Sequence, residues 1–350
     1  MKAFVWDFNC ILHDLRQRVD LTRNPREADV LILWQDVRGG PAELARLNRE
    51  YLHKPCIVVQ HGRGATRDYL APNNFKLLAD RICVWGPREA RNMERAGFGD
   101  RAIVTGSPLL NRLKQRTYAK FSERVILFTP VITSHEEPDN LEVFFELKRI
   151  EHEYVQEMLR SNKEALKTEW HSWVLDPTCA TERQIPYRIL SRNFYVVSKL
   201  TEIHDVNLYQ GEYLKSAQVN VRHLEYCLEA MTKVSCVVGL EEGTFQLMCA
   251  YYGIPCIIVD GFKYGEYGGV KDYAPEIIKT AACRWTSLSD LRKSIEEELE
   301  TDKAAERRAV VLDELGNPDS DPVQNIINLA SELAGGSIEK EVQHATVSTV

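Results

Sequence analysis

The chain has 350 residues, of which 44% are hydrophobic and 27% are charged, and its formal net charge is -7. This composition is typical of a globular protein, and the length is enough for two domains. No apolar run reaches the ~20 residues that a membrane span needs. The opening MKAFVWDFNC reads as a strand rather than a secretory signal, so we expect a cytoplasmic protein with no transmembrane segment.

The nine cysteines form no CxxC pair. Cys56, Cys83, Cys236 and Cys256 lie inside apolar, strand-like runs, which predicts buried, reduced thiols. Zinc needs clustered ligands, and the sequence shows none, so no metal site is expected.

Charge is distributed unevenly along the chain. Residues 1–120 hold 21 basic and 13 acidic residues, whereas the remainder holds 23 basic and 38 acidic residues. Part of that acidity is solvated helix surface. The arginines of the first part flank predicted strand ends, which favours an anionic partner there.

In chain order, short apolar runs alternate with helical patterns, which predicts an α/β domain with a parallel sheet. The predicted strands of the first domain are 2–8, 28–34, 55–59, 81–85 and the run ending at Gly106-Ser107-Pro108. A helix is expected after Gly39-Gly40-Pro41 and another after Gly86. Residues 113–123 read as a linker.

A second α/β series follows the linker. Its predicted strands are 124–130, 194–200, 234–239 and 254–260, and its predicted helices are 140–167, 244–252, 287–299 and 323–333. We therefore expect an N-terminal Rossmann-like domain at 1–120, a C-terminal one at 121–334, and a disordered tail at 335–350. Ligands of such sheets bind at the carboxyl ends of the strands, and domain interfaces favour small-molecule sites.

Three positions at predicted strand ends carry candidate chemistry. His61 follows Val-Val-Gln and precedes Gly62, where a histidine can act as an acid or a base. Lys199 ends an apolar strand and can neutralise a phosphate, although an exposed lysine is the simpler interpretation. The junction Gly239 to Phe245 joins a strand to a helix, whose N-terminus favours a diphosphate, although such junctions are more often structural.

Several common signatures are absent from the sequence. There is no GxGxxG, no GxxxxGK[ST] and no GxSxG. A dinucleotide cofactor, a P-loop ATPase and a serine hydrolase of that type are therefore unsupported, and no cofactor is expected.

Together these motifs resemble the GT-B glycosyltransferase superfamily, and most closely its branch of CDP-glycerol glycerophosphotransferases and capsule-polysaccharide glycosyltransferases. The likeness lies in the segments 60–62, 79–86, 97–108 and 237–260, in that order. Two departures concern the donor phosphates: Thr201-Glu202 follows Lys199-Leu200 where the branch has His-Pro, and Glu241-Glu242 stand where small hydroxyl residues are usual.

The resemblance implies two Rossmann-like domains facing across a cleft and a glycosyltransferase that needs no metal. A nucleotide-sugar donor would lie on the second domain and an anionic acceptor, such as a surface glycan or a lipid-linked saccharide, on the first. His61 is the expected base, with Asp36 and Asp68 as substitutes. The remaining expected contacts divide into two groups. Those to the donor come from Lys199, Glu241, Glu242, Gly243, Thr244, Thr133, Ser134 and His135, and those to the acceptor from Gly62, Arg63, Arg67, Gly86 and Ser107.

Three alternatives stay open. The acceptor could be DNA, because some sugar transferases of this fold modify bases. The chain could be a UDP-sugar 2-epimerase, since those enzymes share the fold and a similar second-domain motif. It could also be an unrelated or non-catalytic α/β protein. The basic first part is compatible with a peripheral contact with an anionic membrane.

Overall fold

The computed structural model describes most of the two ends of the chain and short parts of its middle. The described residues are 1–6, 12–71, 73–118, 126–129, 146–147, 149–150, 171–172, 228, 235–239, 242–260, 266–267, 270–271, 280 and 282–347. The chain forms two compact units. The first comprises Met1–Gln115 and Leu312–Val350, and the second comprises Arg116–Val311.

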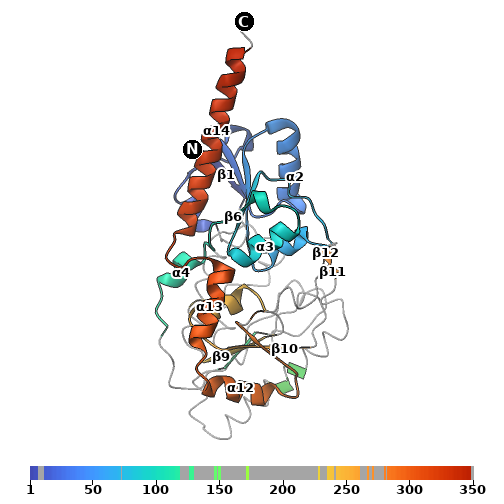
Figure 1. Cartoon of the computed structure of the whole chain (residues 1–350), viewed down its shortest axis with the longest axis vertical. Helices are drawn as coiled ribbons and strands as arrows, with labels where there is room; N and C mark the ends of the chain where they lie inside the picture. Colours follow the sequence, from blue (N-terminus) through green and yellow to red (C-terminus); the bar gives the residue numbers. More distant parts are fainter. Residues whose placement is uncertain are drawn as a thin grey trace, which may run out of the picture. The chain divides into compact units, whose positions relative to one another are not determined.

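The first unit is built on a six-stranded parallel sheet in the order β2-β1-β3-β4-β5-β6 (Figure 1). Its strands are β1 (Lys2–Trp6), β2 (Asp20–Leu21), β3 (Val30–Leu33), β4 (Cys56–Val59), β5 (Arg81–Val84) and β6 (Ala102–Val104). Its helices are α1 (His13–Arg16), η1 (Pro25–Glu27), α2 (Gly39–Leu47), η2 (Asn48–Leu52), η3 (Ala65–Tyr69), α3 (Pro87–Arg95), η4 (Gly99–Arg101), α4 (Leu110–Lys114) and α14 (Pro322–Val347).

Both faces of this sheet are buried, which explains the continuous apolar runs of its strands. Leu31 and Leu33 pack on one face with Leu44 of α2 and Met93 of α3. Alternate residues such as Ile32 pack on the other face, where α1 and the first turns of α14 cover them through side chains that include Leu12, Leu15, Val323, Ile326 and Ala330. The C-terminal helix therefore belongs to the core of the first unit.

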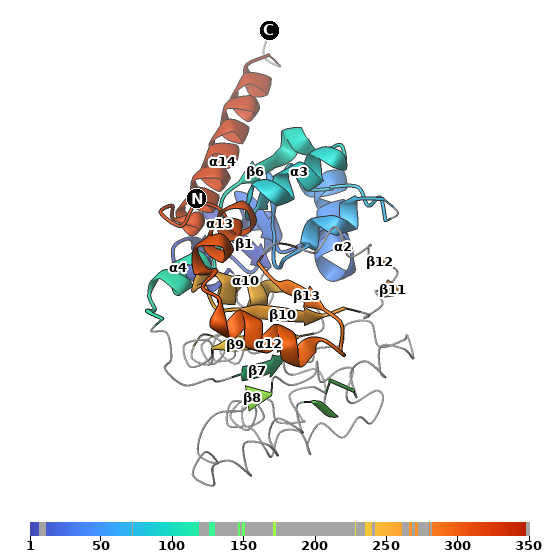
Figure 2. The same ribbon diagram turned by 60° about the horizontal axis from the view of Figure 1, so that its bottom comes forward.

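The second unit has a parallel sheet in the order β13-β10-β9-β7-β8 and a two-stranded β11-β12 ribbon (Figure 2). The strands are β7 (Ile126–Thr129), β8 (His171–Ser172), β9 (Cys236–Gly239), β10 (Cys256–Val259), β11 (Glu266–Tyr267), β12 (Val270–Lys271) and β13 (Arg284–Thr286). The helices are α10 (Thr244–Tyr251), α12 (Leu291–Glu300) and α13 (Ala304–Leu315), whose last four residues belong to the first unit. Figures 1 and 2 show α10 and α12 on opposite faces of this sheet.

A buried ion pair ties α13 to α12 within the second unit. Arg307 donates to Glu298, and its other nitrogen donates to the carbonyl of Gly253 at 3.2 Å. Both charged side chains are almost completely buried. Each compensates the charge of the other, which would destabilise the fold if it were buried alone.

The division of the chain differs from the expected one at the C-terminus. Residues 312–334, expected in the second domain, belong to the first unit because α14 packs on its sheet. Residues 335–347, expected to be a disordered tail, continue α14. The predicted strand at 194–200 and most of the predicted helix at 140–167 lie outside the described residues.

Candidate functional site

The carboxyl ends of β3 and β4 bring two polar segments together in the first unit. Leu33 of β3 pairs with Val58 of β4, so the residues that follow, Trp34-Gln35-Asp36 and Gln60-His61-Gly62, leave the sheet side by side. The sheet order reverses between β1 and β3, and such a switch point is where ligands of open α/β sheets bind. His61 therefore lies next to the position that this topology favours for a ligand.

The ring of His61 is fixed by the neighbouring strand end. Its Nδ1 lies 3.1 Å from the carbonyl oxygen of Trp34, and the two rings meet edge to face with centroids 4.6 Å apart. A carbonyl can only accept, so Nδ1 carries the proton and Nε2 is the basic nitrogen of this tautomer. Nε2 is thus the ring nitrogen that can accept a proton.

Burial lowers the pKa of His61 to about 4. The carbonyl of Trp34 opposes this by raising it, while the positive charges of Arg38 and Arg67 lower it further. The imidazole is therefore neutral at pH 7. The same two guanidinium groups would attract an anionic group of a ligand near His61.

The two alternatives to His61, Asp36 and Asp68, are both buried, and Asp36 has a structural role. The carboxylate of Asp36 is buried and accepts from the hydroxyl of Tyr69 at 2.6 Å and from the backbone N–H groups of Leu78 and Ala79. Burial raises the pKa of Asp36 against these hydrogen bonds, which lower it. Its oxygens already hold the loop before β5, so we assign it a structural role. Asp68 is buried in η3.

The side chain of Gln60 holds the loop that carries His61. The side-chain nitrogen of this buried residue donates to the carbonyl of Gly62 at 2.9 Å, and its oxygen accepts from the backbone N–H of Trp85 at 2.7 Å. The indole of Trp85 also donates to the carbonyl of Gln60 at 2.8 Å. The end of β4 is thereby tied to the end of β5.

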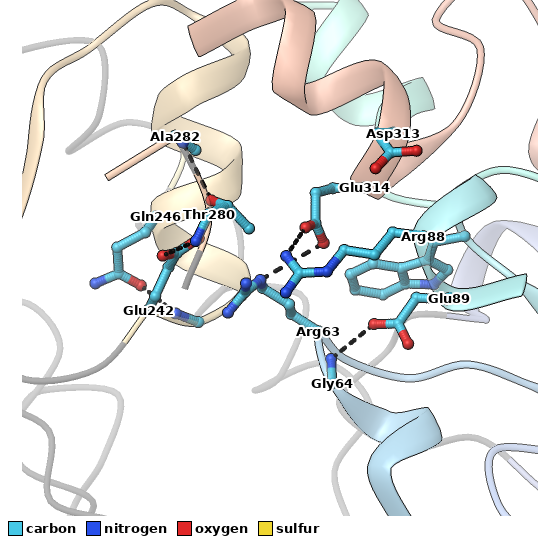
Figure 3. Close-up of polar contacts among 12 residues, drawn as sticks. Arg63, Gly64, Arg88, Glu89, Glu242, Gln246, Thr280, Ala282, Asp313 and Glu314 are labelled. Atoms are coloured by element: carbon cyan, nitrogen blue, oxygen red, sulfur yellow. Dashed lines mark hydrogen bonds and ion pairs between the residues drawn. The ribbon is translucent and has the colours of Figure 1, made fainter. Parts of the chain in front are cut away.

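A buried carboxylate on α3 holds the same loop further on. Glu89 accepts from the backbone N–H of Gly64 at 3.0 Å (Figure 3). It also accepts from the hydroxyl of Thr66. The amide of Asn92 donates to the same carboxylate at 3.4 Å. Gly64 has a φ of +71°, a conformation that glycine adopts without strain. Sequence reasoning missed Glu89, because a glutamate in a helix reads as solvated surface.

The motif positions Gly86 and Ser107 hold the C-terminal segment of the first unit. A Cβ on Gly86 would lie 2.2 Å from the carbonyl oxygen of Asp313. The N–H of Ser107, which is fully buried, donates to the carbonyl of Leu315 at 2.8 Å. Both were expected on the acceptor side, and their observed contacts indicate a packing role instead.

Arg63 was also expected at the acceptor, but its side chain is only 3% exposed and pairs with Glu314. Its Nε lies 3.6 Å from a carboxylate oxygen of Glu314, and Arg88 donates to the other oxygen (Figure 3). Its charge is thus compensated inside the unit. Of the cations near His61, Arg38 and Arg67 are therefore the better candidates for an anionic ligand.

The second unit presents a comparable switch point. The order of its sheet reverses between β7 and β9, whose last residues Thr129 and Gly239 are paired. The two segments expected to contact a donor follow these strands, at 133–135 and 241–244. Thr133, Ser134, His135, Lys199 and Glu241 themselves lie outside the described residues.

The described part of this second segment begins α10. Gly243 is the N-cap, and its N–H donates to the side chain of Gln246 at 3.0 Å. Glu242 is buried and accepts from the backbone N–H of Thr280 at 3.0 Å, from its hydroxyl, and from the indole of Trp285 at 3.3 Å. The carboxylate of Glu242 is thus engaged in holding the strand-to-helix junction before α10. Thr244 and the positive N-terminal end of α10 are therefore better candidates than Glu242 for contact with an anion.

A groove of about 710 Å³ lies elsewhere on the first unit. Its lining includes Lys54 and Pro55, which precede β4, and Arg81 at the start of β5. It therefore opens at the amino edge of the sheet, opposite to His61.

Two further observations apply to the described part of the chain. No helix there is long and apolar enough to cross a membrane. Among the same residues, no group of three or more histidine, cysteine, aspartate or glutamate side chains could hold a metal ion. The six described cysteines are buried, as predicted, and none of them forms a disulfide with another described cysteine.

Comparisons with known proteins identify the fold. No protein-family model and no curated protein matches the sequence. The UDP-GlcNAc 2-epimerase of Methanocaldococcus jannaschii, in complex with UDP-GlcNAc and UDP, is 13% identical, with 95% of this chain and 100% of that chain covered and a TM-score of 0.53. The wall teichoic acid polymerase TagF is 11% identical, with 97% and 90% covered and a TM-score of 0.52.

The UDP-GlcNAc 2-epimerase of Neisseria meningitidis, bound to UDP-GlcNAc, is similar to the same degree. It is 12% identical, with 95% of this chain and 98% of that chain covered and a TM-score of 0.51. At such low identity the likeness shows the fold. The chain has the GT-B fold, and the predicted pair of Rossmann-like α/β domains is confirmed.

Proposed function

We propose that the chain is a glycosyltransferase that moves a sugar from a nucleotide-activated donor to a hydroxyl of an anionic acceptor. The observation that carries the proposal is the state of His61, which is neutral, has Nε2 as its basic nitrogen, and lies next to a sheet switch point and near two guanidinium groups. The resemblance of its sequence motifs to CDP-glycerol glycerophosphotransferases and capsule-polysaccharide glycosyltransferases agrees with this. A surface glycan or a lipid-linked saccharide is the acceptor that we favour.

The chemistry divides between the two units. Nε2 of His61 removes the proton of the acceptor hydroxyl while that oxygen attacks the anomeric carbon of the sugar. The bond from the anomeric carbon to the nucleoside diphosphate breaks, and the diphosphate leaves with the bonding electrons. The N-terminus of α10, at Gly243-Thr244, is our candidate for stabilising its charge, together with Lys199 and the loop 133–135. No step requires a metal or a further cofactor.

The solved structures named above supply the competing candidate. Two of them are UDP-GlcNAc 2-epimerases, and TagF was solved with CDPG. An epimerase converts its nucleotide sugar without an acceptor, whereas a transferase needs one to form product. Transfer to DNA remains a further alternative for the acceptor, and salt-sensitive binding of duplex DNA would favour it.

The proposal is tested first by a panel of nucleotides and nucleotide sugars. We expect one UDP or CDP compound to raise the melting temperature of the chain, because a ligand that binds only the folded state stabilises it. AMP and free sugars serve as controls. If no nucleotide shifts the melting temperature at millimolar concentration, neither the transferase nor the epimerase can be maintained.

The pH dependence gives a second test. The lowered pKa of His61, about 4, keeps its basic form dominant at pH 5, so kcat/KM should stay nearly level between about pH 7.5 and 5 and fall only as the pH approaches 4. The acceptor should carry a phosphodiester or a sulfate, because a phosphomonoester itself titrates near pH 6. An acid limb centred near pH 6.5 would contradict the lowered pKa of His61.

A further inference from the structure

The loop that begins with His61 is held at three points, and one of them comes from the far end of the chain. Gln60 holds the carbonyl of Gly62, Glu89 holds the N–H of Gly64, and Glu314 pairs with the side chain of Arg63. Figure 3 shows Glu314 meeting Arg63 and Arg88, with Gly64 bonded to Glu89. Glu314 lies more than 250 residues after the loop and belongs to the same unit.

The segment that carries Glu314 packs closely against the ends of β5 and β6. A Cβ on Gly316 would lie 2.6 Å from the carbonyl oxygen of Trp85, and one on Gly106 would lie 2.8 Å from the ring of Pro322. The side chain of Asn325 donates to the carbonyl of Thr105 at 3.0 Å. Glu314 is therefore presented from a backbone that has little room to shift.

The charges at this point form a buried set. Glu314 is 2% exposed, Arg63 is 3% exposed and Arg88 is 18% exposed. Burial raises the pKa of Glu314, against the two arginines, which lower it, and the carboxylate of Glu89 raises it further. Removing the charge of Glu314 would take away the carboxylate that faces both guanidinium groups, which weakens the contact that fixes the buried side chain of Arg63.

Arg63 is separated from His61 by Gly62 alone, so its ion pair with Glu314 fixes the loop two residues from the imidazole. We propose that Glu314 is a positioning residue for His61, through which the returning C-terminal segment becomes part of the acceptor half of the site. This role rests on the proposed function. It concerns the placement of Nε2 against the acceptor hydroxyl, since Glu314 acts through Arg63 and does not itself touch substrate.

The adjacent residue offers a matched control. Asp313 of α13 forms an ion pair with Arg91 of α3, the same two helices that the Glu314–Arg88 pair joins. Its carboxylate oxygens lie 3.0 and 2.5 Å from the guanidinium nitrogens. That pair is exposed, with side chains 41% and 56% accessible, and exposed pairs contribute little. Asp313→Asn removes a charge one residue away without touching the pair that reaches the His61 loop.

The experiment compares Glu314→Gln with Asp313→Asn in the full chain. We expect Glu314→Gln to lower kcat of transfer by about 10- to 100-fold, the range that a misplaced catalytic group gives, with the KM for the donor within about twofold of wild type. The imidazole ¹⁵N resonances of His61, assigned with a His61→Asn variant, should shift in Glu314→Gln. Asp313→Asn should leave both kcat and these resonances unchanged.

Two outcomes would overturn the proposal. In the first, Glu314→Gln lowers the melting temperature but keeps wild-type kcat and wild-type His61 resonances, so that the ion pair only stabilises the fold. In the second, Asp313→Asn has the same effects as Glu314→Gln. If Glu314→Gln does not fold, Glu314→Asp and Arg63→Lys replace it, since both retain the charges while they change the geometry of the contact. If the wild-type chain transfers no sugar, the proposed function fails, while the resonances still decide the positioning role.

Discussion

Substitution of His61 by alanine is expected to lower kcat of sugar transfer by about 10²- to 10⁴-fold, the contribution typical of a positioned general base. The structure gives the reason, because the Nδ1–H bond to Trp34 sets the tautomer and the neutral ring presents Nε2 for the proton. The nucleotide should still stabilise the variant, since the candidate donor contacts belong to the second unit. Initial rates and melting temperatures with and without nucleotide measure both effects.

His53→Asn is the matched control for this variant. His53 is an exposed histidine of the first unit that lines the groove at the amino edge of the sheet. Its φ of +52° is one that asparagine tolerates, so this change should be nearly neutral for folding. Full activity in His61→Ala, or an equal loss in His53→Asn, would refute the assignment of His61 as the base.

Substitution of Gly86 by alanine is expected to destabilise the first unit by roughly 1–3 kcal/mol, the cost of overpacking a filled site. The φ of Gly86 is −137°, which alanine adopts freely, so the cost comes from the clash alone. The new Cβ would lie 2.2 Å from the carbonyl oxygen of Asp313 and 2.7 Å from the carbonyl carbon of Glu314. These neighbours are backbone atoms, which cannot relieve the clash by changing rotamer as a flexible side chain can. The C-terminal segment therefore has to shift.

Two measurements follow the effect of this substitution. Thermal unfolding reports the loss of stability. Hydrogen exchange of the Ser107 amide, which donates to the carbonyl of Leu315, reports whether the C-terminal segment has separated from the end of β6. Gly335→Ala is the control, because a Cβ there would meet nothing within 4 Å and alanine favours the helix by about 0.5–1 kcal/mol. Wild-type melting and wild-type protection of Ser107 in Gly86→Ala would show that the packing role is wrong.

The central strands of both sheets could be predicted from the sequence because they are buried on both faces, whereas β2, β8 and β13 were not predicted. The observed β3, β4 and β5 fall within the predicted runs at 28–34, 55–59 and 81–85, and their alternate residues fill the two core layers. The helix α13 and the return of α14 to the first unit were not predicted. An amphipathic helix shows that one of its faces is buried, but its pattern does not say which sheet covers that face.

The candidate site was predicted unevenly for a similar reason. The position of His61 at a strand end was evident from the apolar run before it, whereas the roles of Gly86, Ser107 and Arg63 depend on a segment more than 200 residues away. No local pattern reveals such a partner. For Glu242, the proximity of Thr280 and Trp285 explains why a carboxylate stands at the start of α10. Nothing in the sequence near Glu242 indicated that contact.

One measurement tests the central claim most directly. The chain is incubated with the nucleotide sugar that stabilises it and with a phosphodiester-containing saccharide acceptor, and the products are analysed by mass spectrometry. We predict an acceptor heavier by one sugar residue and an equal amount of nucleoside diphosphate, both lost in His61→Ala. Conversion of the nucleotide sugar to its epimer without acceptor, at the same rate with and without the saccharide, would contradict the account.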